Sequence, residues 1–364
     1  CDIWKSNDGT NISSSDLKYL ANNQYKYVRH IGLSGGEPFL RKDLIEYVTN
    51  VLTFSPKLKS LSITSHAFQT ARLKKYLPEI KKTCDAFDVN FSMNFSLDGD
   101  SYHHERNRGL VGGYDKVIYG TKLCKSLGIK VNLQFTATEH NVYSMPWVLS
   151  FANTHEIPVS FRLATNINRL GVGNTSRIRL SEKQLSFFKD FISSKKLLSN
   201  TKLGKRIFYK LLFQQLEDPY LKRLNSCLFK KQGLFISGLG SSYTCSLSDT
   251  KLQNSVSKDL FSKAKLKKLQ KKLISNNCND CVHDQSGLPS LIRLIKESFL
   301  IRFPFIKKIG FLIKLSSGFY SSSPSAIPHK TLVIGQYGGE HVGDSSILGG
   351  VLSSINSNST DVLS

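Results

Sequence analysis

The sequence predicts an α/β protein whose core is a largely parallel sheet, and three observations support this. Up to about residue 165, short apolar strands alternate with segments that are apolar at helical spacing. Five strands joined by helical crossovers require parallel pairing, because a tight turn cannot connect parallel neighbours. Glycines and polar residues follow the ends of several strands, which is where α/β sheets and barrels bind ligands.

The elements of this core are expected in regular succession. Strands are expected at residues 28–34, 58–64, 87–97, 129–136 and 159–164. Helices are expected at residues 43–52, 71–83, 114–127 and 144–154, and further along at 180–195, 207–216 and 258–274. The clearest strand is 87–97, in which apolar residues alternate strictly from Val89 to Leu97. A turn containing Gly240 predicts a hairpin around residues 235–243.

Length and composition place the chain among globular proteins. Its 364 residues allow two or three domains, and 40% apolar residues exclude a disordered chain. There is no run of ~18 apolar residues, which argues against a membrane-spanning helix. The 50 Lys and Arg residues against 27 Asp and Glu give a net charge of +23. This charge suits either an anionic partner or a solvated, lysine-rich surface.

The cysteines predict metal binding rather than disulfides. There are seven cysteines with one CxxC pair, and we expect a protein without a secretory signal. Cys84 and Cys124 lie in apolar segments and are expected to be buried core thiols. The remaining cysteines are Cys1, which stands alone, and a late group of Cys227, Cys245, Cys278 and Cys281. From the residues alone, the late group suits either zinc or an iron–sulfur cluster.

The sharpest local motif is Gly35-Gly36-Glu37-Pro38, which lies between an apolar strand and a helix. Two glycines let the backbone approach a ligand closely. Glu37 offers a carboxylate at the carboxyl end of a parallel strand, where α/β folds bind ligands. The alternative is a tight strand-to-helix turn without a ligand.

Three motifs occur in order at matching strand ends. They are Cys1-Asp2-Ile3-Trp4, the string LSGGEPFLRKDL around Glu37, and SLDG from Ser96 to Gly99. Together they resemble the radical S-adenosylmethionine (SAM) superfamily over residues 1 to about 165. The resemblance implies a partial (β/α)6 barrel with parallel strands. In that family a CxxxCxxC motif binds a [4Fe–4S] cluster, and Cys1 resembles its third cysteine. We expect a fragment cut at both ends and inactive without the first two cysteines.

The resemblance also implies the chemistry. Three thiolates bind three irons, and the fourth iron binds the amino and carboxylate groups of SAM. An electron from the cluster then cleaves SAM to a 5′-deoxyadenosyl radical, which takes a hydrogen atom from the substrate. No catalytic side chain is assigned, because the cofactors perform the difficult step. The electron donor is expected to be a protein such as flavodoxin or ferredoxin.

By resemblance, particular residues of this chain would bind SAM. Gly35-Gly36-Glu37-Pro38 would hold its amino group, and Ser65 would face its ribose. Ser96 and Arg108 would reach its carboxylate, Arg108 through its fork of donors.

Neighbouring residues carry other expectations. His66 and Ala67 depart from the Asn-Gly pair that the family often has there. Asp98 could be a turn residue instead of a site residue. His103 and His104 are expected at the surface.

The late cysteines resemble the twitch form of the SPASM extension of radical SAM enzymes. Cys227 is followed by Gly240 and Cys245 at the spacing of that extension, and the CxxC pair of Cys278 and Cys281 follows a basic helix. The resemblance implies one auxiliary [4Fe–4S] cluster on these four thiols. A structural zinc ion is the alternative.

The last segment resembles the start of the polysaccharide pyruvyl transferases. A strand near Leu332–Ile334 runs into a glycine-rich turn, which suits a phosphate at a helix N-terminus. This predicts the first strand, loop and helix of a Rossmann-like domain. The expected domains are therefore a radical SAM core, a twitch-like α+β domain, a segment of basic apolar helices with a Ser/Pro linker, and this opening, at residues 1–200, 201–285, 286–330 and 331–364.

The leading functional hypothesis is a cytoplasmic radical SAM enzyme in sugar or surface-polysaccharide biosynthesis. Alternatives are a peptide-modifying maturase, an RNA-modifying enzyme and a noncatalytic, zinc-stabilised remnant. Nucleic acid ranks low as a partner because the basic residues are spread and no RNA-binding module is present. Residues 288–315 are basic and apolar, so they suit either contact with the inner membrane surface or a helical hairpin packed between domains.

Overall fold

The computed structural model describes residues 28–165, 178, 180–230, 233–238, 240–243, 245–247, 251–253, 278–284 and 331–336. The strands in this part of the chain are β1 (His30–Gly35), β2 (Ser60–Ser65), β3 (Asn90–Ser96), β4 (Lys130–Ala137), β5 (Val159–Leu163), β6 (Gly233–Ile236), β7 (Ser242–Tyr243), β8 (Lys251–Gln253) and β9 (Thr331–Gln336). They form one sheet in the order β5-β4-β3-β2-β1-β9-β6-β7-β8. The first five are parallel to one another, as the sequence predicts.

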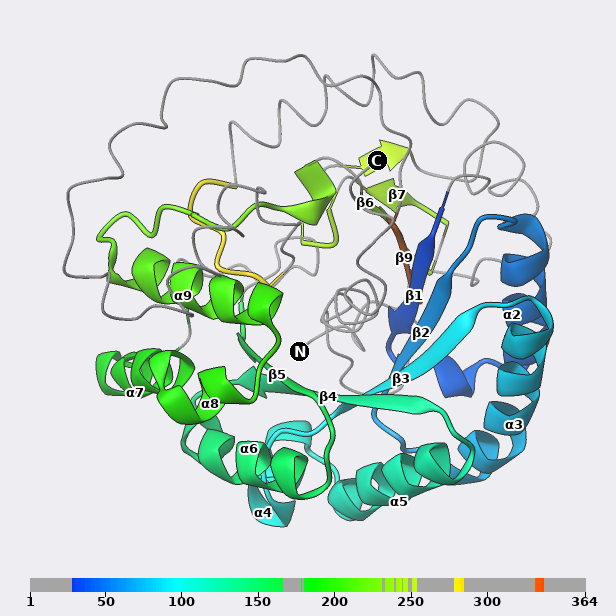
Figure 1. The fold of residues 1–364 in the computed structure, drawn as a ribbon, viewed down its shortest axis with the longest axis horizontal. Helices are drawn as coiled ribbons and strands as arrows, with labels where there is room; N and C mark the ends of the chain where they lie inside the picture. The colour runs from blue at the N-terminus through cyan, green and yellow to red at the C-terminus, as the bar shows by residue number, and fades with distance from the viewer. Residues whose placement is uncertain are drawn as a thin grey trace.

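Helices connect these strands and continue after them. The helices are α2 (Leu44–Phe54), α3 (Thr70–Ala86), α4 (Ser101–Arg108), α5 (Gly113–Ser126), α6 (Met145–Thr154), α7 (Glu182–Ser193), α8 (Lys195–Ser199) and α9 (Leu203–Glu217). Figure 1 shows the sheet curving, with α2, α3, α5 and α6 along its outer side. The predicted α/β fold with a partial, parallel barrel is therefore confirmed.

The two faces of the curved sheet differ in chemistry. Side chains alternate between faces along a strand. One face carries Leu61 and Ile63 on β2 and Phe91, Met93 and Phe95 on β3, and these join the helices in one apolar core. The other face is lined with polar residues, which the parallel register places side by side: Ser60, Ser62 and Thr64; Ser92, Asn94 and Ser96; Asn132, Gln134 and Thr136; Ser160 and Arg162. Because the helices cover the apolar face, the polar face lines the inside of the curve.

Helix α4 has no counterpart among the predicted helices. Its sequence, SYHHERNR, lacks the apolar repeat that marks a buried helix face. Its ends carry clear signals, however, since the Asp100 side chain accepts a hydrogen bond from the His103 N–H, and Gly109 ends the helix with φ 68°. Capping therefore defines this helix.

Strand β9 lies within the same sheet as the core. It pairs in parallel with β1 on one side, His30 beside Thr331, and with β6 on the other, Gly233 beside Thr331. The predicted hairpin is confirmed, because β6 and β7 pair antiparallel with Phe235 opposite Tyr243. Residues 337–364 lie outside the described residues, so a separate Rossmann-like domain remains a prediction.

Several other predictions also fall outside the described residues. They concern Cys1, the helix at 258–274, the basic segment 288–315 and the linker at 316–328. Among the residues that are described, no helix is long and apolar enough to cross a membrane.

Candidate functional site

The glycine-rich turn ends β1 and places Glu37 at the carboxyl edge of the sheet. Gly35 has φ 149°, a conformation that side chains rarely allow, so the turn requires glycine there. Pro38 then begins a short 3-10 helix (Pro38–Leu40), and the Glu37 side chain caps it by accepting from the Phe39 N–H at 3.1 Å. The Glu37 carboxyl group is thereby directed back towards the strand ends.

The Glu37 carboxyl group is buried and bonded to the end of β2. Ser65 Oγ donates to both carboxyl oxygens at 2.9 Å, and the His66 N–H donates at 2.8 Å. Burial raises the pKa of Glu37 to about 7, and these hydrogen bonds act in the opposite direction. Ser65 Oγ also accepts from the Ala67 N–H at 2.9 Å. In this structure Ser65 therefore positions Glu37, and its contact with a ribose remains a prediction.

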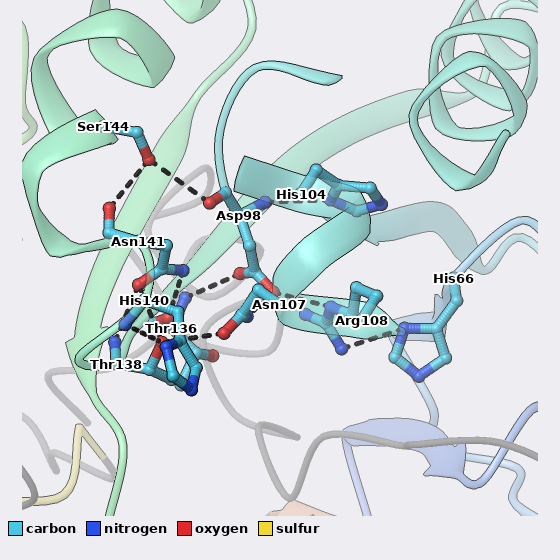
Figure 2. A network of polar contacts seen from close by, with 10 residues as sticks. All are labelled: His66, Asp98, His104, Asn107, Arg108, Thr136, Thr138, His140, Asn141 and Ser144. Carbon is cyan, nitrogen blue, oxygen red and sulfur yellow. Dashed lines mark hydrogen bonds and ion pairs between the residues drawn. The ribbon is translucent and has the colours of Figure 1, made fainter. Parts of the chain in front are cut away.

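The second cluster of the site is centred on Asp98, which follows β3. Figure 2 shows its carboxylate between the end of α4 and β4. Asp98 Oδ2 lies 2.6 Å from Arg108 Nε and accepts from Asn107 Nδ2 at 2.8 Å. Its Oδ1 accepts from the Thr136 N–H at 3.0 Å. Asp98 is completely buried, so it does more than shape a turn.

Arg108 connects this cluster to the end of β2. Its Nη1 lies 3.1 Å from His66 Nδ1, as Figure 2 shows. His66 also holds Glu37 through its backbone, so the two clusters form one continuous polar edge. The side chain of Arg108 is buried.

His104 corrects one expectation. It is 1% exposed rather than at the surface, because its Nδ1 accepts a hydrogen bond from the Asp98 N–H at 3.1 Å. Burial, together with the charge of Arg108, lowers the pKa of His104 to about 3, so the imidazole is neutral. His103 is part-buried and lies 2.8 Å from Asp100.

Unpartnered polar atoms mark the inner face beside these clusters. Ser96 Oγ is buried at the end of β3 and has no hydrogen-bond partner among the described residues. Gln134, its register partner on β4, is also buried. Neither its Oε1 nor its Nε2 has a hydrogen-bond partner among the described residues. Buried polar groups are rarely left unpaired, so such atoms indicate a place for a ligand or water. The alternation of polar residues in β4 is the sequence signal that could have identified Gln134.

The late cysteines influence one another electrostatically, and Cys227 and Cys245 pack against the same small apolar cluster. The Cys245 thiol is desolvated, which raises its pKa, and the charges of Cys227, Cys281 and Cys278 raise it further. That all four sulfurs converge on one site remains a prediction. Within the described part of the chain, no three His, Cys, Asp or Glu side chains form a group that could hold a metal ion. By contrast, Cys84 and Cys124 are fully buried in the core, as predicted, and burial raises both pKa values to about 12.

Specific hydrogen bonds attach the CxxC segment to the core. The buried Gln215 of α9 donates from Nε2 to the Cys281 carbonyl at 3.0 Å. Arg223 donates from Nη1 to the same carbonyl at 2.8 Å and to the His283 carbonyl at 3.0 Å. Residues 278–284 therefore lie in a defined position against the end of α9.

The predicted site residues thus fall into two groups. Those of the first group lie along the carboxyl edge of the parallel strands: Gly35, Gly36, Glu37, Pro38, Ser65, Ser96 and Arg108. The late cysteines form the second group, of which Cys281 is bonded through its carbonyl to Gln215 of α9.

Comparisons with known proteins give sequence relatives for part of this chain. No family model matches it. It is 30% identical over 151 residues to a pre-heme d1 synthase of Dinoroseobacter shibae, covering 40% of this chain and 33% of the relative. It is 28% identical over 180 residues to a probable GTP 3′,8-cyclase of Archaeoglobus fulgidus, covering 48% and 51% respectively. The chain therefore spans about a third to a half of the length of these relatives.

Solved structures share the fold over most of the chain. The structure described as native anSMEcpe with bound AdoMet matches with a TM-score of 0.52 at 18% identity, covering 84% of this chain and 91% of that one. A histidine-tagged form of the same protein matches with a TM-score of 0.50 at 17% identity, covering 81% and 84%. These similarities extend the shared fold beyond the parallel strands.

Proposed function

We propose that this chain forms the core of a radical SAM enzyme with an auxiliary iron–sulfur cluster. Its sequence relatives and its fold both support the radical SAM superfamily. One observation carries the proposal furthest. A buried Glu37 with a pKa of about 7 follows β1, and the Ser96 hydroxyl, unpartnered among the described residues, ends β3 at the same carboxyl edge of one parallel sheet.

The residues at this edge suit both the amino group and the carboxylate of SAM. Glu37 would bind the positive α-amino group, which favours the ionised carboxylate in a buried site. Ser96 would donate to the SAM carboxylate, which would give its buried hydroxyl a partner. Ser65 and the His66 N–H would keep Glu37 in place. When bound, SAM and a reduced cluster supply the radical that abstracts hydrogen.

We assign the auxiliary cluster to Cys227, Cys245, Cys278 and Cys281. Two observations support a fully ligated [4Fe–4S] cluster on these thiols: the electrostatic influence of Cys227, Cys281 and Cys278 on Cys245, and the resemblance to the twitch extension. Cys1 would ligate the SAM-binding cluster together with two cysteines of a CxxxCxx segment before it.

The substrate part of the proposal rests on sequence alone. Residues 331–364 resemble the start of a pyruvyl transferase, which favours a sugar or surface-polysaccharide substrate. The enzyme would be cytoplasmic and would receive electrons from a flavodoxin or ferredoxin. A peptide substrate is the alternative. The apolar and basic residues 288–315 would contact either an anionic membrane surface or a neighbouring domain.

The test uses the chain extended by CxxxCxx before Cys1 and reconstituted anaerobically with iron and sulfide. Addition of SAM and dithionite should yield 5′-deoxyadenosine. Ser96→Ala should weaken SAM binding about tenfold, as expected for a hydrogen bond to a charged group. Ser92→Ala is the matched control. Ser92 lies on the same face of β3 and its buried hydroxyl also lacks a hydrogen-bond partner among the described residues, but it precedes Ser96 by four residues and lies away from the carboxyl edge. Absence of 5′-deoxyadenosine from a fully reconstituted protein would reject the proposal.

A further inference from the structure

A buried arginine on the inner face of the barrel has no hydrogen-bond partner among the described residues. Arg162 lies near the carboxyl end of β5 and is 3% exposed. Its Nε, Nη1 and Nη2 atoms all lack a hydrogen-bond partner among the described residues. Its ion pair is with Asp284, whose Oδ2 is 3.7 Å from Nη1, too far for a hydrogen bond. A guanidinium group carries five donors in a planar fork, so burying these donors without hydrogen-bond partners is costly.

The charges described around Arg162 do not balance. Asp284 is a carboxylate that acts on two cations, Arg162 and Lys205 of α9. Burial lowers the pKa of Lys205 to about 8, and the charge of Arg162 adds to this effect. Asp284 is also shared with His283, whose Nδ1 lies 3.1 Å from Oδ1. Even with Asp284 ionised, the two cations give this cluster an excess positive charge.

The arginine continues a row of unsatisfied groups across the sheet. Gln134 stands in register beside Ser96 on one side and Ser160 on the other, and Arg162 follows Ser160 on the same face of β5. Among the described residues, the row therefore runs from Ser96, which we assign to SAM, past the unpartnered amide of Gln134 to Arg162. Beyond Arg162 lies Asp284, three residues after Cys281.

We propose that Gln134 and Arg162 form the substrate site, and that the substrate is a small anionic molecule whose carboxylate or phosphate group is held by Arg162. Both groups accept two parallel hydrogen bonds from a guanidinium fork, and both neutralise the excess charge. Gln134 orients the part of the substrate nearer to SAM through its amide. This assignment rests on the proposed function for its role in catalysis, but the anion site itself can be tested without SAM.

The test is isothermal titration of the reconstituted 364-residue chain with inorganic phosphate, and separately with acetate, at low ionic strength and without SAM. We expect saturable binding of at least one probe, and the probe that binds identifies the group. Arg162→Gln should weaken that binding at least tenfold. Asp284→Asn should strengthen it severalfold, because it removes the carboxylate that competes with the ligand. Arg41→Gln is the matched control, since Arg41 is also buried and pairs with Asp43, and it should leave binding unchanged.

The outcomes separate this site from the proposed function. No saturable binding of either probe, equal affinity in Arg162→Gln, or lost binding in Asp284→Asn would each overturn the anion site. Should Arg162→Gln fail to fold, Arg162→Lys keeps the charge without the fork and is expected to bind the probe more weakly than the wild type; equal affinity in that variant would overturn the site as well. Phosphate or acetate binding without any SAM cleavage would leave the anion site standing while rejecting the radical SAM proposal.

Discussion

Nε of Arg108 lies 2.6 Å from Oδ2 of Asp98, and the two side chains are 3% and 0% exposed. Arg108 is the last residue of α4, and Asp98 follows β3, so the pair attaches α4 to the carboxyl edge of the sheet. The resemblance implies that Arg108 binds the SAM carboxylate, and that binding would use only the nitrogen atoms that do not face Asp98. The pair fixes the guanidinium in place beside His66.

Asp98→Asn should destabilise the protein by about 3 kcal/mol, because it leaves the charge of Arg108 buried without its counter-ion. The measurement is urea denaturation at neutral pH. Asp43→Asn is the control, because Asp43 pairs with Arg41 at 2.6 Å but is 38% exposed, so solvent screens that pair and the loss should stay within about 1 kcal/mol. Equal losses in the two variants would contradict a special role for the buried pair.

The stability of the protein should depend on the ionisation of Glu37. Its pKa rises from the ordinary value of 4.5 to about 7 on folding, so between these pH values the folded state binds more protons than the unfolded state. The contribution of this group to stability is therefore highest below about pH 4.5 and falls by roughly 3 kcal/mol in total as the pH rises to about 7. Glu37→Gln should remove this pH dependence from the free energy of unfolding. Glu46→Gln, on the exposed side of α2, should leave the pH dependence unchanged. The test is urea denaturation across this range.

Binding of SAM should favour the ionised form of Glu37 and so offset the cost of burying its charge. A positive amino group stabilises the ionised Glu37, so SAM affinity of the reconstituted protein should rise as the pH increases through about 7. In Glu37→Gln the affinity should be lower and should lose this rise. Equilibrium dialysis with labelled SAM measures both, and a wild-type affinity that stays flat from pH 6 to pH 8 would count against Glu37 as the amino-group ligand.

Gly99→Ala should be strongly destabilising. Gly99 has φ 148°, and a Cβ atom there would lie 2.5 Å from His103 Cβ and 2.8 Å from Ser144 Oγ. We expect the free energy of unfolding to fall by about 2 kcal/mol or more, as measured by thermal denaturation. Gly109→Ala separates strain from crowding, since Gly109 has φ 68° and a Cβ atom there would meet no described atom within 4 Å. This second variant should lose only about 1 kcal/mol.

The late cysteines should hold iron as a unit. Ala replacement of any one of Cys227, Cys245, Cys278 and Cys281 should lower the iron bound after anaerobic reconstitution, which should be about four per chain in the wild type. Cys84→Ala should leave iron unchanged, because Cys84 is buried in the core away from this group. Extension of the chain with CxxxCxx before Cys1 should raise iron to about eight. Stoichiometric zinc in anaerobically purified protein would indicate a structural site instead.

The order and type of the core elements follow from the sequence. Strict alternation of apolar residues in β3, together with helical crossovers between strands, predicts a parallel sheet without reference to any tertiary contact. Glycine and capping residues place the Gly35-Gly36-Glu37 turn at the carboxyl end of β1. These features are local, because periodicity and backbone preferences act over a few residues.

Which polar groups meet is decided by tertiary structure. His104 is buried because its ring accepts from the Asp98 N–H, a contact between α4 and the end of β3 that helix periodicity does not contain. Arg162 and Asp284 are 122 residues apart and meet only because Gln215 and Arg223 hold residues 278–284 against α9. Likewise, β9 joins the sheet beside β1 although its sequence resembles the start of another domain. Sequence patterns report burial and local geometry, whereas the partner of a charge depends on the chain path between them.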